Sequence, residues 1–201
     1  SCTVEVPLSL VEELPIHLTR FHGCGLGRFF TPEQGKMILA ARLASLSQGY
    51  SGVSWCLLNL LVELINRDII PVIPEEGSVG ASGDLTPLSY VAGALIGERD
   101  TYYQGEIVNS AEAFKKEGLK PIKLRPKEGL AIMNGTAVMT ALACQAFDRA
   151  QYASKLMTRI TALSSLALKG NSDHCDDILF SVKPHPGQTE VAKRIQTDLN
   201  H

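Results

Sequence analysis

The stretch Gly77-Ser-Val-Gly-Ala-Ser-Gly-Asp-Leu-Thr-Pro-Leu-Ser-Tyr90 joins a glycine-rich loop to an apolar run, and its Ala-Ser-Gly triplet can carry unusual chemistry. Gly83 has no side chain, so its amide nitrogen can approach a preceding carbonyl closely. If that nitrogen attacks the Ala81 carbonyl and two waters leave, Ser82 becomes the exocyclic methylene of a five-membered ring. Such a ring is a strong electrophile, which no ordinary side chain supplies. Asp84 follows directly, and we expect it to orient the turn or to move protons.

Two simpler interpretations of the same loop compete with this chemistry. Gly77, Gly80 and Gly83 recur at every third position, so their amides could cradle an anion, although the sequence fits neither the phosphate-loop nor the dinucleotide-binding glycine pattern. The loop could also be a tight turn before a helix, with Ser82 or Asp84 as the N-cap. Because Ala-Ser-Gly is a common triplet, the three residues alone favour these simpler interpretations.

The longer segment changes that balance, because Gly77 to Tyr90 resembles the signature of the histidine/phenylalanine ammonia-lyase family. Members of that family make the 4-methylidene-imidazol-5-one (MIO) prosthetic group from an Ala-Ser-Gly triplet. Three further segments are similar to family elements and occur in the same order. They are Leu46-Ser-Gln-Gly-Tyr-Ser-Gly52, Glu128-Gly-Leu-Ala-Ile-Met-Asn-Gly-Thr136 and His185-Pro-Gly-Gln188. The resemblance runs nearly from end to end, and the chain is identified as a member of the family.

The resemblance implies a mainly α fold with a minor β component. Residues 1–136 would form the MIO-forming domain, and residues 137–201 would form the start of the central helical bundle with a following loop and helix. Family enzymes are much longer than these 201 residues. Their tyrosine base would precede residue 1, and further active-site elements and bundle helices would follow His201. We therefore expect a fragment or truncated member that is inactive when isolated.

For the parent protein, the resemblance implies an aromatic amino acid ammonia-lyase, with histidine ammonia-lyase as the preferred assignment. The methylene derived from Ser82 would accept the substrate amine, a base would take the β-proton, and ammonia would leave an α,β-unsaturated acid. Ala81, Ser82 and Gly83 would form MIO autocatalytically, so no metal or diffusible cofactor is expected. A tyrosine or phenylalanine ammonia-lyase, a 2,3-aminomutase and an inactive homologue remain alternatives.

Three residues outside the triplet are candidates for the site. Asn134 precedes a long predicted helix, and its amide can donate to a developing oxyanion or simply cap that helix. In the family, the matching asparagine contacts MIO and the substrate amine. Phe21 and His22 match a bend that contacts the substrate ring. Phe21 is typical of phenylalanine-specific members and His22 of histidine or tyrosine enzymes, so the pair leaves the substrate open.

Other polar residues are assigned supporting or structural roles. We expect Asp84 and Tyr50 to support the site, Tyr50 because its turn matches the family's turn beneath the signature loop. Ser54 stands where many members have arginine, so a local ion pair would be missing. His185 is interpreted as structural. The run Asp173-His-Cys-Asp-Asp177 points its polar side chains in different directions, so we interpret it as a solvated loop and expect no metal site.

Composition argues against several other classes. The 201 residues carry a net charge of −2, which provides no field for nucleic acid or an anionic membrane. The longest apolar stretch, 85–97, is too short to span a bilayer. The expected partners are an aromatic amino acid substrate and, from the resemblance, further copies in a homotetramer. Five cysteines without a C-x-x-C pair suit reduced thiols in the cytoplasm. They are Cys2, Cys24, Cys56, Cys144 and Cys175.

The hydrophobic pattern also predicts most secondary structure. Thr31 and Pro32 mark the start of one helix, and the apolar helix over 54–66 is expected to be covered on both sides. A hairpin should turn at Gln104-Gly105, and Ser110 should cap the short helix that follows. Helices are predicted over residues 9–20, 32–47, 54–66, 86–97, 110–117 and 137–169 and after Gln188, with extended segments at 69–73 and 120–127.

Overall fold

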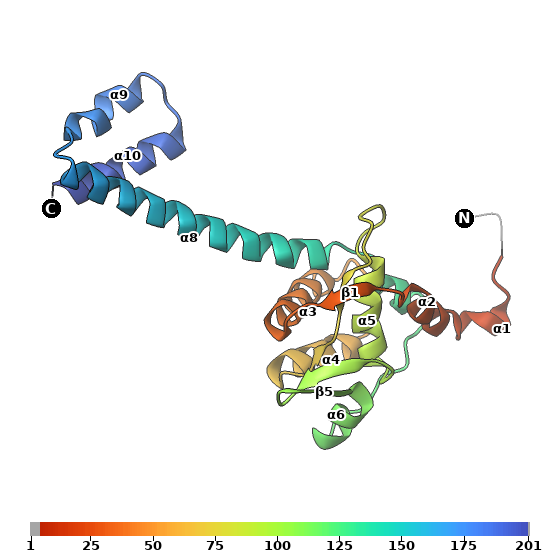
Figure 1. Cartoon of the computed structure of the whole chain (residues 1–201). Helices are drawn as coiled ribbons and strands as arrows, with labels where there is room; N and C mark the ends of the chain where they lie inside the picture. Colours follow the sequence, from red (N-terminus) through yellow and green to blue (C-terminus); the bar gives the residue numbers. More distant parts are fainter. Residues whose placement is uncertain (1–4, 201) are drawn as a thin grey trace. The chain divides into compact units, whose positions relative to one another are not determined.

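The computed structural model describes residues 5–200 and is mainly helical, with two small antiparallel sheets (Figure 1). This confirms the predicted fold class. The chain divides into two compact units, which meet between Ala143 and Cys144. The boundary predicted after residue 136 coincides with the start of α8 (Ala137–Ala167) and precedes the boundary between the two units. The division into domains at residue 136 stays a prediction.

The first unit contains both helices and short strands. Its strands are β1 (Leu26–Phe29), β2 (Ile70–Pro71), β3 (Pro74–Glu76), β4 (Asp100–Tyr103) and β5 (Glu106–Asn109). Its helices are α1 (Leu8–Val11), α2 (Leu14–His22), α3 (Pro32–Leu46), α4 (Trp55–Asn66), α5 (Leu85–Leu95), α6 (Ser110–Lys116) and α7 (Glu128–Met133), followed by the start of α8.

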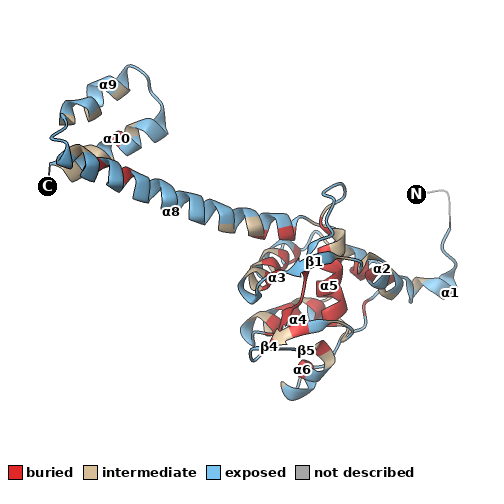
Figure 2. Ribbon diagram, in the orientation of Figure 1, coloured by how far each residue is buried: buried red, intermediate tan, exposed pale blue. Residues whose placement is uncertain are grey.

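Helix α5 forms the centre of the first unit. Every residue from Pro87 to Leu95 is buried, and α2, α4 and α7 pack against this helix. Figure 2 shows the buried residues gathered on α5 and on the elements around it. In α4, Leu61 faces the core whereas Trp55 is 74% exposed, so the expectation that α4 is covered on both sides is wrong for this chain. Because burial of apolar surface is the main stabilising term, α5 gives the loop before it a fixed base.

Both sheets are built from short strands, and each sheet contains one pair of strands that lie apart in sequence. In the first, β1 pairs with β3, and Leu26 lies opposite Glu76. In the second, β4 lies between β2 and β5. Gln104 and Gly105 both have positive φ, at +52° and +84°, which is the backbone of a two-residue turn that matches strand twist. The predicted hairpin is therefore confirmed, whereas β1 was not predicted.

Capping side chains decide where two of the helices begin. The Thr31 hydroxyl accepts from the Gln34 amide at 3.3 Å, and the Gln34 side chain accepts from the Thr31 amide at 3.0 Å. This reciprocal capping box confirms the predicted start of α3. Helix α6 differs, because the Asn109 side chain accepts from the Ala111 amide at 3.0 Å. Asn109, and not Ser110, is therefore its N-cap.

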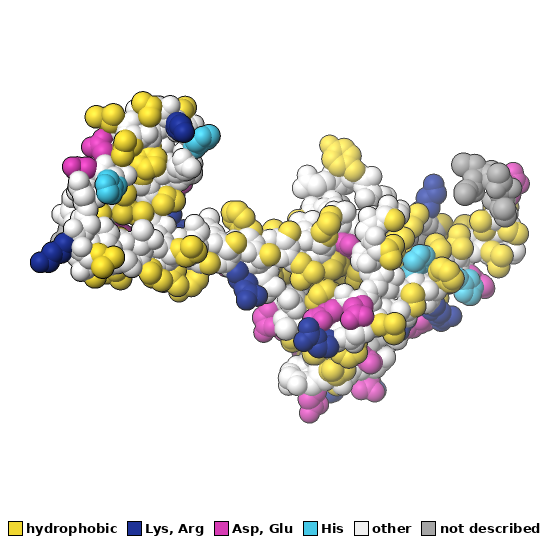
Figure 3. All heavy atoms as spheres, turned by 45° about the horizontal axis from the view of Figure 1, so that its top comes forward, with side chains coloured by type: hydrophobic (Ala, Val, Ile, Leu, Met, Phe, Trp, Pro, Cys, Tyr) yellow, Lys and Arg dark blue, Asp and Glu magenta, His cyan; other side chains and the backbone are white. Residues whose placement is uncertain are grey.

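The second unit contains the rest of α8, a 3-10 turn (Ser172–Cys175), α9 (Asp177–Ser181) and α10 (Pro186–Leu199). Arg159 of α8 forms an ion pair with Asp198 of α10. Large apolar side chains of α8, such as Phe147, are exposed, and Figure 3 shows hydrophobic side chains along much of this helix. Within residues 5–200, Glu128–Ala167 is the one helical stretch long and apolar enough to cross a membrane, by length and composition alone. Core helices of soluble proteins have the same property.

Candidate functional site

The signature loop, defined here as residues 77–84, leads from β3 into α5 and exposes Ala81 and Ser82 at a bend. Its end is held tightly. Gly83 has a φ of +82°, and a Cβ at this position would lie 2.7 Å from the Gly135 carbonyl oxygen, so only glycine fits. The next amide, that of Asp84, donates to the same oxygen at 2.7 Å. The loop is therefore pressed onto the segment that joins α7 to α8.

The Asp84 carboxylate ties the loop to α8. It is 4% exposed, and its Oδ1 accepts from the Ser78 hydroxyl at 2.8 Å. Its Oδ2 accepts from the Met139 amide at 3.0 Å, in the first turn of α8, where amides lack helical partners and the helix dipole is positive. Asp84 makes no side-chain capping bond to α5. Asp84 therefore occupies the N-cap position of α5, as the simpler interpretation predicts, but its carboxylate bonds to Ser78 and Met139 and not to α5.

Arg42 of α3 holds the α7–α8 junction from the interior. Its side chain is 3% exposed, and a Cβ on Gly135 would overlap its guanidinium group. Burial lowers the pKa of Arg42 below its ordinary value, while the negative charge of Asp84 acts in the opposite direction. The buried guanidinium group thus donates hydrogen bonds to the carbonyl groups at the end of α7, close to the Asp84 carboxylate. Its acceptors are the carbonyl oxygens of Ala131, Ile132 and Asn134.

Asn134 ends α7 and does not cap α8. It occupies the C-cap position of α7, and its own amide donates to the Leu130 carbonyl at 2.8 Å. Its side chain is exposed, and within residues 5–200 the side-chain amide makes no hydrogen bond. Because Gly135 follows directly, Asn134 lies beside the end of the signature loop. The capping alternative for Asn134 is wrong, and its side-chain amide is available to an incoming group.

The pairing of β1 with β3 brings two predicted parts of the site together. Phe21 and His22 are the last two residues of α2, and the bend predicted there begins at Gly23. Strand β1 follows this bend, and β3 precedes the signature loop. A Cβ on Gly77 would lie 3.4 Å from the Gly25 Cα, so the two backbones touch. The Tyr90 hydroxyl of α5 also accepts from the Gly25 amide at 3.1 Å. The bend and the Ala-Ser-Gly loop therefore lie at the same end of this small sheet.

His22 has a defined tautomer in this arrangement. Its Nδ1 lies 2.8 Å from the Leu18 carbonyl oxygen. Because a carbonyl oxygen only accepts, the proton of the neutral ring is assigned to Nδ1, and Nε2 is left as an acceptor. The Phe21 ring packs edge-on against the imidazole, with centroids 5.2 Å apart, and its side chain is 79% exposed.

Ionic contacts fasten the bend that carries His22. Arg20 binds Glu98 through two hydrogen bonds, of 3.0 Å and 2.6 Å. Arg99 donates to the Gly23 carbonyl at 3.2 Å and stands 4.7 Å from the centre of the Tyr90 ring. The Arg20–Glu98 pair therefore holds the end of α2 to the segment after α5, and Arg99 holds the bend to α5.

Replacing Glu98 with glutamine should slightly lower the free energy of unfolding of the first unit, and only at pH values where Glu98 is ionised. The hydrogen bond from Arg20 lowers the pKa of Glu98 below its ordinary value of 4.5. A carboxyl group with a depressed folded pKa contributes stability above its unfolded pKa, and that contribution is lost as the pH falls through the folded value. Because the pair is largely exposed, the loss at neutral pH should be about 0.2–1 kcal/mol.

Urea unfolding of the variant and the wild type at several pH values checks this expectation. Glu75→Gln is the matched control, because its partner Arg28 has a side chain that is 89% exposed. The Glu98→Gln difference should disappear well below pH 4.5, the ordinary value for this group. A difference of constant size across the whole pH range would contradict the assignment to this ion pair.

The Tyr50 side chain is 96% exposed in this structure, and its supporting role stays a prediction. The turn that carries it is tied to α7. The buried Glu128 carboxylate accepts from the Ser54 amide at 2.6 Å and from the Arg125 amide at 2.7 Å. Ser54 also caps α4, so two backbone amides, and not an arginine, satisfy this carboxylate.

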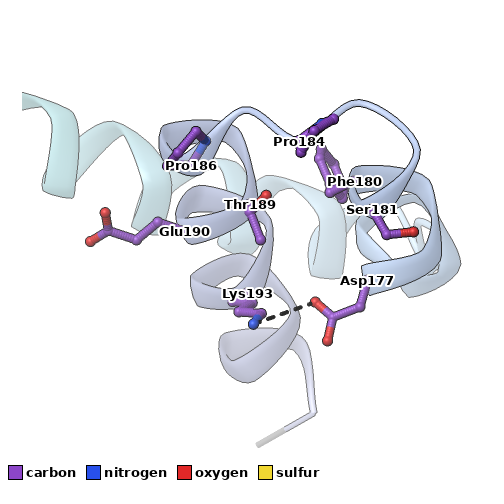
Figure 4. A pocket seen from close by; sticks show the side chains of 8 residues that line it. All are labelled: Asp177, Phe180, Ser181, Pro184, Pro186, Thr189, Glu190 and Lys193. Atoms are coloured by element: carbon purple, nitrogen blue, oxygen red, sulfur yellow. Dashed lines mark ion pairs between the residues drawn. The ribbon is translucent and has the colours of Figure 1, made fainter.

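The second unit contains an open hollow of about 670 Å³ between α9 and α10 (Figure 4). On one side Lys193 lies 4.0 Å from Asp177, an ordinary surface ion pair. None of the predicted site residues lines this hollow, so it is not a candidate for the chemistry. Its lining residues are Asp177, Phe180, Ser181, Pro184, Pro186, Thr189, Glu190 and Lys193.

Neither a metal centre nor a disulfide is found in the part of the chain that the structure describes. Within residues 5–200, no group of three His, Cys, Asp or Glu side chains could hold a metal ion. Residues 173–175 of the polar run belong to the 3-10 turn, and His185 sits at the start of α10 without a capping bond. Cys24, Cys56, Cys144 and Cys175 are free thiols, and Cys2 lies outside the described residues.

Sequence reasoning missed three residues that shape the site: Arg42, Ser78 and Glu128. Each acts through a contact that spans a turn or a long stretch of chain, such as the ninety residues between Arg42 and Ile132. One signal was available for Arg42, because a cation among the apolar residues of α3 is rarely buried without acceptors. Ser78 and Glu128 lie in segments of ordinary polarity and carry no such signal.

Several known proteins are similar to this chain in structure or sequence. Histidine ammonia-lyase from Trypanosoma cruzi superposes with a TM-score of 0.89 at 34% identity, covering 95% of this chain and 38% of that one. Phenylalanine aminomutase from Pantoea agglomerans gives 0.89 at 35% identity, covering 94% of this chain and 36% of that one. Histidine ammonia-lyase from Bos taurus is 41% identical over 196 residues, 97% of this chain and 30% of the relative.

These likenesses define the fold as that of the ammonia-lyases and aminomutases. The sequence profile of the family described as aromatic amino acid lyase matches residues 1–201. The chain belongs to this family, as its motifs predicted. It spans between 30% and 38% of the length of the relatives named above.

Proposed function

We propose that the protein to which this chain contributes is an aromatic amino acid ammonia-lyase that uses an MIO group made from Ala81-Ser82-Gly83. The observation that carries the proposal is the signature loop itself. Its reactive residues are exposed, while its end is fixed by Gly83 against Gly135 and by the buried Asp84 carboxylate. A loop that only reversed the direction of the chain would need neither of these two contacts. These residues fit the group, and MIO once formed supplies an electrophile for the substrate amine.

The chain's own residues have separate roles in this proposal. Asp84 holds the loop to α8, and the N-terminus of α8 adds positive potential beside the site. Asn134 offers a side-chain amide that can donate to a carbonyl or carboxylate oxygen of the substrate. Phe21 and His22 form a neighbouring wall of the substrate site, at the same end of the β1–β3 sheet. The group that takes the β-proton is not among the residues we assign.

Histidine is the preferred substrate in this proposal. With its proton on Nδ1, His22 presents Nε2 as an acceptor, which suits a ring that carries a donor. An imidazole N–H or a phenol O–H provides one, whereas a phenyl ring would leave this nitrogen unpaired. The matched bovine protein is a histidine ammonia-lyase. Tyrosine is the alternative with a donor, and a 2,3-aminomutase is the alternative reaction, because the matched Pantoea protein is an aminomutase.

Assembly and compartment are further parts of the proposal. We propose a homotetramer in which other segments and copies cover the exposed apolar side chains of α8 and complete the site. The isolated 201-residue chain is then expected to be inactive. Free thiols at Cys24, Cys56, Cys144 and Cys175 suit a cytoplasmic location. The absence of nucleic-acid and membrane partners stays a prediction.

A segment exchange tests the activity directly. The 201-residue chain would replace the matched segment of the bovine histidine ammonia-lyase, to which it is 41% identical. We expect this chimera to release ammonia and to form the unsaturated acid from histidine, and to be less active on tyrosine and phenylalanine. Intact mass should show the loss of two waters, mapped to the peptide with Ala81–Gly83.

Ser82→Ala in the same chimera is the control, because it removes the hydroxyl that leaves as water. It should prevent the loss of the second water, so that no methylene forms, and should abolish the activity. Chromatography of the products separates the two reactions, because a β-amino acid would indicate an aminomutase. A folded, tetrameric chimera that lost two waters but turned over none of the three amino acids would refute the proposed activity.

A further inference from the structure

We propose that Ser78 is a positioning residue for the cyclisation of Ala81-Ser82-Gly83, because its hydroxyl closes the base of the signature loop. This inference rests on the proposed function. The Ser78 Oγ lies 2.8 Å from Asp84 Oδ1, and it donates, since an ionised carboxylate only accepts. The Gly80 amide in turn donates to the same Oγ at 3.4 Å. One hydroxyl therefore links the first half of the loop to the buried anchor at its end.

The remaining ends of the loop are fixed by packing. Gly77 lies under α5, where a Cβ would be 2.5 Å from the Thr86 methyl carbon. At the other end, Gly83 lies against Gly135, and Asp84 bonds to Gly135 and Met139. Residues 79–82 are exposed between these ends. The Ser78–Asp84 bond is the cross-link that shortens the free part of the loop to these residues.

Cyclisation needs the Gly83 nitrogen to reach the Ala81 carbonyl carbon. As the carbon–nitrogen bond forms, the carbon–oxygen bond breaks, and the first water leaves with the Ala81 oxygen and the amide protons of Ser82 and Gly83. The second water leaves with the Ser82 hydroxyl and its α-proton, which gives the methylene. No oxidant or reductant takes part. The rate therefore depends on how often the loop holds the two reacting atoms together.

The Ser78 hydroxyl raises that frequency in two ways. Closing the base of the loop removes conformations in which residues 79–82 are extended, and that entropy is no longer lost at the moment of reaction. The bond is also made to a carboxylate in a buried position, so it is stronger than a neutral hydrogen bond. We expect Asp84 to keep its bonds to Gly135 and Met139 in variants at position 78, because residue 78 takes part in neither bond. The contribution of Ser78 is therefore specific to the loop and not to the core.

The test measures MIO formation and not turnover. Wild type, Ser78→Ala and Ser78→Thr forms of the whole protein would be produced in parallel, and the fraction that has lost two waters followed by intact mass with time. Ser78→Ala should slow the loss roughly ten- to a hundredfold, as expected for a lost hydrogen bond to a charged group. Ser78→Thr keeps the hydroxyl and should restore most of the rate. Thermal midpoints should stay close to the wild type, since residue 78 is exposed.

Ser47→Ala is the matched control, because it also removes an exposed hydroxyl that makes one hydrogen bond, to the Ala44 carbonyl at 3.0 Å. It should cyclise at the wild-type rate. If wild type and Ser78→Ala lose two waters equally fast, the role of Ser78 is refuted while the proposed function stands. If the wild type itself never loses two waters, the proposed function fails and this inference fails with it.

Discussion

Replacing Arg42 with methionine should destabilise the first unit by about 3–5 kcal/mol. The side chain is 3% exposed and donates to three carbonyl oxygens at the end of α7. Methionine fills much of the same volume, but it leaves those acceptors without donors and leaves the buried Asp84 carboxylate without its nearby cation. Hydrogen exchange of the α5 amides measures the loss, because α5 lies at the centre of the core and opens only with the unit.

Two further variants separate the causes. Arg28→Met removes an arginine whose side chain is 89% exposed and whose partner is Glu75, and it should change stability by less than about 1 kcal/mol. Arg42→Lys keeps the charge but cannot match the fork of the guanidinium group, so it should fall between Arg42→Met and the wild type. A loss below about 1 kcal/mol for Arg42→Met would contradict the structural role assigned to this arginine.

Local signals in the sequence were sufficient for much of the fold. Thr31, Pro32 and Gln34 define the start of α3 through contacts within one helical turn, so residue types alone predict it. The hairpin at Gln104-Gly105 is predicted for the same reason, because its turn depends on backbone conformations that these two residues permit. The long apolar pattern after Asn134 likewise predicts α8 to within a few residues.

The elements that sequence reasoning missed depend on contacts between distant segments. Strand β1 is exposed along its whole length and exists because β3 pairs with it. Helix α7 begins after Lys127, which has a φ of +70°, and its first residue, Glu128, is buried. The Glu128 carboxylate accepts from the nearby Arg125 amide and from the distant Ser54 amide. No local pattern encodes such partners. Propensity and periodicity describe one segment at a time, so they cannot report pairing between segments.

The candidate site divides along the same line. The Ala-Ser-Gly triplet, Asn134 and the Phe21–His22 bend carry side chains that suggest chemistry by themselves, and the motif gives them a role. Ser78 and Arg42 act only through what they touch in the folded chain. Tyr50 was suggested by a motif match, and its side chain is 96% exposed in this structure, so its supporting role stays a prediction.

Replacing Gly83 with alanine should abolish the loss of two waters, although the residue still supplies an amide nitrogen for the attack. Gly83 has a φ of +82°, and an added Cβ would stand 2.7 Å from the Gly135 oxygen and 2.9 Å from the Gly135 nitrogen. The left-handed conformation costs alanine about 1–2 kcal/mol, and the contact adds about 1–3 kcal/mol unless the loop moves away. Movement is therefore expected, and it carries the nitrogen away from the Ala81 carbonyl.

Gly80→Ala separates the two effects, because Gly80 has a φ of +65° but nothing within 4 Å of an added Cβ. It should carry the conformational cost alone and still lose two waters, more slowly than the wild type. Intact mass of the whole protein reports both variants, and hydrogen exchange at the start of α8 reports whether the Asp84–Met139 bond survives. If Gly83→Ala loses two waters as readily as Gly80→Ala, the contact with Gly135 does not position the reacting nitrogen. The fixation of the loop would then have to come from Asp84 and Ser78 alone.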